Sequence, residues 1–133
     1  LYAQKGLTEL KPLVKRCLVA FPNEHELRLL TGEDHREGAE VLLAEGAQIV
    51  AVKLGKKGCY LTDGEESHLV KPFRVKVVDT TGAGDAFCAG FIYGLLKNKT
   101  LRECGILGNF VASRVIMKMG ARNGLPQRED LPL

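Results

Sequence analysis

Short apolar runs alternate with amphipathic segments along this chain, and the alternation predicts its secondary structure. The runs at 17–21 and 48–52 have the length of strands and no polar face, which is typical of parallel strands that are covered on both sides. Apolar positions at helical spacing, bounded by capping residues and glycines, predict helices. The expected helices span 8–15, 24–30, 34–45, 83–96 and 100–120, with a hairpin over 59–71 and a strand over 73–78. Strands that alternate with capped helices predict an α/β fold with a mostly parallel sheet.

Composition narrows the class of protein. A chain of 133 residues with 45% hydrophobic residues can bury the core of one compact domain and is too short for two. The net charge of +3 comes without a basic run, and tryptophan is absent, so nucleic acid is not an expected partner. No apolar run has the length of a membrane span, so no membrane partner is expected. The four cysteines form no C-x-x-C pair, which favours buried thiols in a reducing cytoplasm.

A glycine turn lies between the expected strand over 73–78 and the expected helix over 83–96. Gly82 and Gly84 flank Ala83, and a backbone without Cβ atoms can turn sharply and let another group approach. The first N–H groups of the helix then point outward together, and the helix dipole adds a partial positive charge. The turn therefore predicts an anion site that suits a phosphate group.

The acid that follows the turn suggests a chemical role. Asp85 would repel a phosphate in such a cradle unless its negative charge is needed. In phosphoryl transfer, a carboxylate beside the transferred group orients the attacking hydroxyl and accepts its proton. A carboxylate at a helix start is a weak base, but a loose transition state makes the hydroxyl acidic late in the reaction. We therefore expect Asp85 to act as a general base.

The residues at 79–87, Asp-Thr-Thr-Gly-Ala-Gly-Asp-Ala-Phe, resemble the carboxy-terminal signature of the ribokinase-like (PfkB) carbohydrate and nucleoside kinases. Asn23 and Glu26 are similar to a second element of that family, Asn-x-x-Glu. The resemblance covers nearly all of the chain and implies a three-layer ribokinase-like fold. It implies that residues 1–133 are the carboxy-terminal ATP-binding and catalytic portion of one kinase domain, and that the sugar-binding half and its lid lie outside this chain.

The resemblance also implies an activity and a set of roles. The reaction would be ATP-dependent phosphorylation of a hydroxymethyl group on a sugar or nucleoside, with ATP and Mg²⁺ as cofactors. Asp85 would be the catalytic base, and the amides of Gly82, Ala83 and Gly84 would form the anion hole, with Gly84 also contacting ATP. Asp79 and Thr81 match the family's monovalent-cation site, at which K⁺ would bind. A homodimer formed through the lid would fit the same family.

Asn23 and Glu26 have two readings. An Asn at a helix start with a Glu three residues later forms a capping box, which needs no ligand. The same helix start follows a parallel strand, where Asn23 would contact ATP and both side chains could hold Mg²⁺ through waters. The spacing favours the cap and the resemblance favours the metal. One helix terminus can serve both roles.

Two further segments match nucleotide contacts of the family. The loop from Lys53 to Gly58 is either a plain glycine turn with exposed lysines or a second phosphate-facing loop, and it lacks the Walker A pattern. The resemblance assigns Gly55 and Gly58 to ATP, whereas Lys53 stands where some members have Thr. Asn109 is either an exposed helix residue or a neighbour of the adenine pocket.

Two other functions compete with a kinase. A dinucleotide-binding domain would need the third glycine of G-x-G-x-x-G at position 87, which is Phe87, and Glu103 follows a helix instead of ending a strand. A noncatalytic nucleotide-binding or oligomerisation module would share the glycine turn but lack the half that binds the acceptor. An assay for phosphate transfer separates this module from a kinase.

Overall fold

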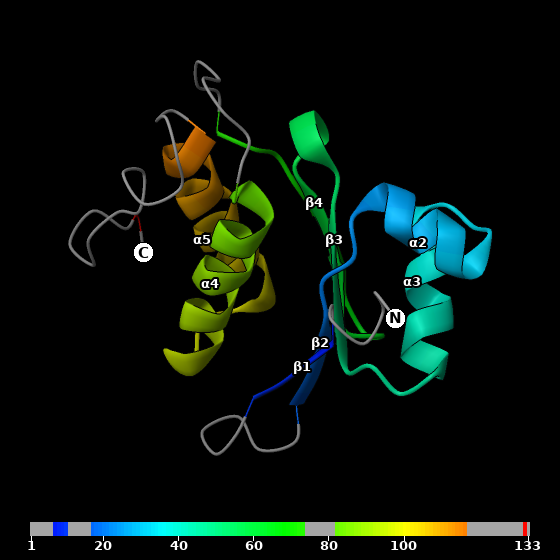
Figure 1. Cartoon of the computed structure of the whole chain (residues 1–133). Helices are drawn as coiled ribbons and strands as arrows, with labels where there is room; N and C mark the ends of the chain where they lie inside the picture. Colours follow the sequence, from blue (N-terminus) through cyan, green and yellow to red (C-terminus); the bar gives the residue numbers. More distant parts are fainter. Residues whose placement is uncertain (1–6, 11–16, 74–81, 117–131, 133) are drawn as a thin grey trace. The chain divides into compact units, whose positions relative to one another are not determined.

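A computed structural model of the chain describes residues 7–10, 17–73, 82–116 and 132 (Figure 1). The chain divides into two compact units, Leu1–Val70 and Lys71–Leu133. The first unit contains a sheet with helices, and the helices described in the second are α4 and α5. The fold is therefore α/β, as the sequence predicted.

The sheet of the first unit has five strands in the order β1-β2-β3-β4-β5. They are β1 (Leu7–Leu10), β2 (Cys17–Ala20), β3 (Ile49–Lys53), β4 (Cys59–Thr62) and β5 (Ser67–Val70). Among the described strands, β2 and β3 pair parallel and the other three pairings are antiparallel. The prediction of a mostly parallel sheet is therefore wrong for these strands. The connections from β3 to β4 and from β4 to β5 are too short for a crossover, so these pairs must be antiparallel.

The amino-terminal segment differs from its predicted form. Residues 8–10 were expected at the start of a helix, but they belong to β1, with Leu7 opposite Ala20 and Leu10 opposite Cys17. A full ladder of backbone hydrogen bonds along β2 outweighs the weak amphipathic pattern of this segment. Residues 11–15 lie outside the described residues, as do 74–78 of the expected strand over 73–78.

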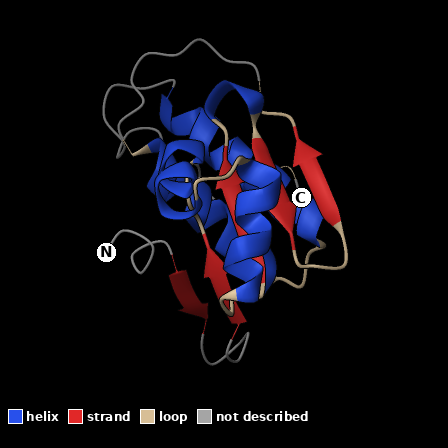
Figure 2. Ribbon diagram, turned by 90° about the vertical axis from the view of Figure 1, so that its right-hand side faces the viewer, coloured by secondary structure: helices blue, strands red, loops and turns tan. Residues whose placement is uncertain are grey.

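Two helices cover one face of this sheet. The helices α2 (Glu24–Thr31) and α3 (His35–Ala44) follow β2 and confirm the predicted positions within one or two residues. Figure 2 shows them in front of the strands. Their apolar faces and the sheet share one buried cluster, which contains Ala20, Leu27, Ala39, Ala47, Val50, Val52, Leu54 and Tyr60. This cluster holds the start of α2 against the ends of β2 and β3.

The second unit contains an antiparallel pair of helices, α4 (Ala83–Leu96) and α5 (Leu101–Ile116) (Figure 1). The predicted helix over 83–96 is confirmed. The two backbones approach closely at Gly90, where a Cβ would lie 2.6 Å from the carbonyl oxygen of Leu107. A Cβ on Gly94 would lie 2.8 Å from the Cys104 sulfur. Small residues thus fix the contact between α4 and α5, which orients the start of α4.

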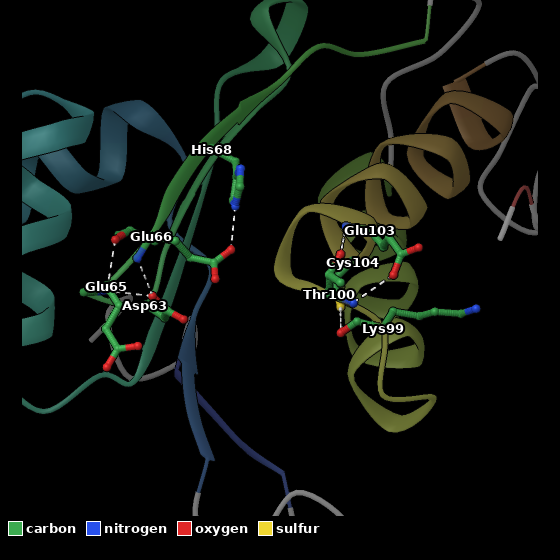
Figure 3. A network of polar contacts seen from close by, with 10 residues as sticks. Asp63, Glu65, Glu66, His68, Lys99, Thr100, Glu103 and Cys104 are labelled. Atoms are coloured by element: carbon green, nitrogen blue, oxygen red, sulfur yellow. Dashed lines mark hydrogen bonds and ion pairs between the residues drawn. The ribbon is translucent and has the colours of Figure 1, made fainter.

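The start of α5 is closed by the predicted capping box. The Thr100 N–H donates to Glu103 Oε1 at 2.9 Å, and the Glu103 N–H donates to Thr100 Oγ1 at 3.1 Å (Figure 3). The Thr100 N–H bond holds the pKa of the Glu103 carboxyl below its usual value. Cys104 in the same turn is buried, and burial raises the pKa of its thiol to about 12. Cys104 is therefore a core residue of low reactivity.

The hairpin from β4 to β5 is closed by its own polar contacts. The Asp63 carboxylate accepts the N–H groups of Glu65 and Glu66, both at 2.9 Å, and His68 Nε2 lies 2.6 Å from Glu66 Oε1 (Figure 3). These contacts explain the acidic turn without a ligand.

Among the described helices, none combines the length and the apolar content that crossing a membrane requires.

Candidate active site

The glycine turn opens α4 in the conformation that the sequence requires. Gly82 is the N-cap residue, with φ 81° and ψ 0°, in the left-handed region that other residues rarely adopt. The first helical hydrogen bond runs from the Ala86 N–H to the Gly82 carbonyl at 2.9 Å. The N–H groups of Ala83, Gly84 and Asp85 therefore precede that bond at the positive end of the helix dipole. The start of α4 has the backbone geometry of an anion site.

Asp85 occupies the third position of α4 and is exposed. Acids at the same position of α2 and α5 are used differently: Glu26 and Glu103 accept the N-cap N–H of their own helices at 2.8 and 2.9 Å. Among the described residues, the Asp85 carboxylate has no hydrogen-bond or ion-pair partner. The Glu37 N–H of α3 donates to the N-cap Asp34 side chain at 3.0 Å, but the Glu37 carboxylate does not accept the N-cap N–H, and no glycine turn precedes this helix. Asp85 thus combines an uncommitted carboxylate with neighbouring helix-start amides.

The start of α2 confirms the predicted capping box. The Glu26 N–H donates to Asn23 Oδ1 at 2.7 Å, and the Asn23 N–H donates to Glu26 Oε1 at 2.8 Å. Both side chains are half-buried. An amide oxygen and a carboxylate are donor types that suit Mg²⁺, and each oxygen retains a second lone pair beyond the cap. The cap and a water-mediated metal contact are therefore compatible.

The ends of the parallel strands bring two predicted residues together. Asn23 forms a parallel bridge with Lys53, and the Lys53 N–H donates to the Pro22 carbonyl at 2.9 Å. The capped start of α2 and the end of β3 thus lie side by side at the carboxyl end of β2 and β3. In open α/β sheets, ligands bind at such strand ends.

The loop after β3 contains a short 3₁₀ turn, Gly55–Lys57. Gly55 has φ 60° and Gly58 has φ 95° with ψ −127°, so the backbone alone calls for glycine at both positions. The Leu54 N–H donates to the Gly58 carbonyl at 2.8 Å and closes the loop. Lys56 and Lys57 are exposed. The glycine turn is confirmed, and a nucleotide contact by this loop stays a prediction.

Asn109 was expected to be either an exposed helix residue or a neighbour of the adenine pocket, and the structure excludes the first interpretation. Its side chain is buried on α5, with 7% of its surface exposed, and its Nδ2 donates to the Lys71 carbonyl at 3.0 Å. Next to it, the rings of Phe110 and Phe73 meet edge to face at 5.5 Å. The contact between Phe73 and Phe110 could not be predicted from the sequence, because two aromatic residues far apart in a chain carry no signal of their contact.

The described residues contain two separate groups of predicted site residues. In the first unit, Asn23, Glu26, Lys53, Gly55 and Gly58 gather at the ends of β2 and β3. In the second, the amides at 82–84 and the Asp85 carboxylate share the first turn of α4. No cluster of three or more His, Cys, Asp or Glu side chains suited to a metal occurs in the described part. Asp79 and Thr81 lie outside the described residues.

Comparison with solved structures shows that the chain forms part of a ribokinase-like fold. Residues of this chain superpose on a ribokinase from Thermotoga maritima with a TM-score of 0.78 and 36% identity, covering 84% of this chain and 40% of that one. A fructokinase from Vibrio cholerae, solved with fructose, ADP and calcium ion bound, gives a TM-score of 0.76 and 30% identity over 84% and 39% of the two chains.

The sequence matches the pfkB family of carbohydrate kinases over residues 2–128. A protein from Archaeoglobus fulgidus described as an uncharacterized sugar kinase is 51% identical over 129 residues, which are 97% of this chain and 52% of that protein. The chain therefore belongs to the pfkB family of carbohydrate kinases. It spans about half the length of this relative and less of the two solved structures.

Proposed function

We propose that this chain is the nucleotide-binding and catalytic portion of an ATP-dependent kinase, which phosphorylates a hydroxymethyl group of a sugar or nucleoside. The observation that carries the proposal is the first turn of α4. There an exposed Asp85 lies beside helix-start amides in a chain whose family consists of carbohydrate kinases. An anion cradle with a carboxylate at its edge suits the transfer of a phosphoryl group to an alcohol.

In the proposed reaction, the first turn of α4 and the start of α2 have different roles. The hydroxyl oxygen of the acceptor forms a bond to the γ-phosphorus while the bond from that phosphorus to the β,γ-bridging oxygen breaks, and ADP leaves. The hydroxyl proton passes to the Asp85 carboxylate. The amides of Gly82, Ala83 and Gly84 stabilise the negative charge on the transferring phosphoryl oxygens. A Mg²⁺ ion bound near Asn23 and Glu26 would offset charge on the phosphates.

The loop Gly55–Gly58 and the neighbouring Lys53 are proposed to contact the nucleotide. Support comes from their position at the carboxyl ends of β2 and β3 and from the exposed positive charges of Lys56 and Lys57. A monovalent cation at Asp79 and Thr81 is part of the same proposal. Its basis is the family signature at 79–87 and the potassium-bound fructokinase and phosphofructokinase structures among the chain's structural relatives.

The proposed activity is tested with the intact polypeptide that carries this chain. ATP and Mg²⁺ are mixed with a panel of ribose, fructose, 2-keto-3-deoxygluconate, adenosine and cytidine, and ADP release and product mass are measured. We expect one class of acceptor to gain a phosphate. A shift in melting temperature with Mg·ADP but no transfer to any acceptor would instead favour the noncatalytic module. No nucleotide effect of either kind would contradict both.

The start of α2 offers a test of the proposed metal role. Asn23→Ala removes a cap and should lower the free energy of unfolding by about 1 kcal/mol. If Asn23 also holds Mg²⁺, the variant should bind Mg·ATP more weakly while binding of ATP without Mg²⁺ changes little. Thr100→Ala breaks the matching cap of α5 and is the control, since it should cost similar stability and leave Mg·ATP binding intact. If both variants bind Mg·ATP with equal affinity, Asn23 caps α2 and does not hold Mg²⁺.

A further inference from the structure

One turn of α5, residues 108–111, contacts two different segments of the chain, which are the start of α4 and residues 71–73. Gly108 and Val111 are three residues apart and share the helix face that meets α4. A Cβ on Gly108 would lie 2.7 Å from the ring of Phe87, and Val111 shares a buried cluster with Ala86. This face of the turn therefore packs directly against the residues that follow Asp85.

The other two residues of the turn hold a different segment. Asn109 Nδ2 donates to the carbonyl of Lys71 at 3.0 Å, and the Phe110 ring meets Phe73 edge to face at 5.5 Å and 78°. Lys71 directly follows β5, and Phe73 comes two residues later. The hydrogen bond and the ring contact attach this short stretch, 71–73, to α5.

The 108–111 turn thus joins the two flanks of one stretch of chain. Residues 71–73 precede the connection that leads to Gly82, and Ala86 and Phe87 follow Asp85. A helical turn is a rigid element, because its backbone is fixed by its own hydrogen bonds. The two described flanks, 71–73 and 86–87, therefore both contact the same helical turn. The described residues before and after the glycine turn are thus both held by α5.

We propose that Asn109 is a positioning residue, which through its bond to Lys71 holds the glycine turn and Asp85 in their working arrangement. Its effect on catalysis rests on the function proposed above. This role differs from a contact with the adenine ring. The amide is buried, with 7% of its surface exposed, and its Nδ2 is directed to the main chain of a segment 38 residues away. A buried donor with a main-chain acceptor orders that chain.

The test compares two α5 variants of the intact kinase. Asn109→Leu keeps the size of the side chain and removes the donor. Ser113→Ala is the matched control, because Ser113 is also buried on α5 and its hydroxyl donates within the helix, to the Phe110 carbonyl at 2.7 Å. The readouts are the single-turnover rate of phosphoryl transfer, the ATP dissociation constant, and hydrogen exchange of the amides at 82–86.

We expect Asn109→Leu to slow transfer by roughly 10- to 100-fold, since small displacements of a reacting group have effects of this size. Its ATP dissociation constant should stay within several fold, and its amides at 82–86 should exchange faster than in Ser113→Ala. A raised ATP dissociation constant with unchanged exchange at 82–86 would overturn the positioning role and favour a nucleotide contact. Equal exchange in both variants would overturn it as well.

The positioning role can still be tested if the Asn109→Leu variant does not fold or if the kinase is inactive. If Asn109→Leu does not fold, Phe73→Leu weakens the same attachment at a side chain that is 38% exposed, and the same readouts apply. If the unmodified kinase transfers phosphate to no acceptor, the proposed function fails, and exchange at 82–86 alone decides the positioning role. Faster exchange than in Ser113→Ala would then support it, and unchanged exchange would overturn it.

Discussion

Replacing Asp85 by asparagine in the intact kinase should reduce the single-turnover rate of phosphoryl transfer by roughly 10²-fold or more. The amide has almost the same shape as the carboxylate, but it cannot accept the proton of the acceptor hydroxyl. ATP should still bind within several fold of its original affinity, because the backbone amides of the glycine turn are unchanged. Loss of a negative charge beside the phosphates would, if anything, favour ATP binding.

The control for this prediction is Glu103→Gln. Glu103 is the third residue of α5, as Asp85 is of α4. A glutamine at position 103 keeps an Oε1 oxygen that can accept the Thr100 N–H, so the cap of α5 is retained. If the loss of a charge at a helix start were enough to slow phosphoryl transfer, both variants would be slowed equally. If Asp85 is the catalytic base, only Asp85→Asn is slowed. We expect Glu103→Gln to transfer phosphate at the original rate. An unchanged transfer rate in Asp85→Asn would show that the base has been assigned wrongly.

Gly90→Val should lower the free energy of unfolding by about 2–3 kcal/mol, as overpacking of a tight core does. A Cβ on Gly90 would meet the Leu107 oxygen at 2.6 Å and the Leu107 carbonyl carbon at 2.9 Å. These are backbone atoms of α5, so relief requires the two helices to separate. Because small domains are stable by only about 5–15 kcal/mol, the loss is a large share of the total. Urea unfolding measures it.

The matched control for the helix contact is Ala89→Val. Ala89 precedes Gly90 on α4 and is exposed, so its valine costs helix propensity and meets no backbone. We expect its loss of stability to stay below about 1 kcal/mol. If the two variants unfold at the same urea concentration, the close approach of α4 and α5 at Gly90 contributes nothing to stability.

Local signals in the sequence predicted most of the helices and the glycine turn. Asn23 with Glu26, and Thr100 with Glu103, form caps within four residues of chain, so neighbouring residues alone specify them. Gly82 needs a positive φ for the turn to enter α4, and this too is a property of the residue itself. Features that are encoded within one turn can be predicted without a structure.

Features that depend on distant segments were predicted less well. The apolar run of β3 predicted a buried strand but not its partners, and its antiparallel pairing with β4 follows from a short loop. Residues 8–10 of β1 were mistaken for the start of a helix because their pairing with β2 leaves no periodic signal. The burial of Asn109 depends on a carbonyl 38 residues earlier. For β1 and Asn109, a contact with a separate segment of the chain decided the outcome.

The central claim is that the amides at the start of α4 hold the phosphates of ATP. It is tested most directly by an NMR titration of the ¹⁵N-labelled protein that follows the amide signals of Gly82, Ala83, Gly84 and Asp85. Mg·ATP should shift these signals strongly, whereas adenosine, which lacks phosphate, should leave them near their original positions. If Mg·ATP binds elsewhere on the protein while the signals at 82–85 do not move, the glycine turn is not the phosphate site.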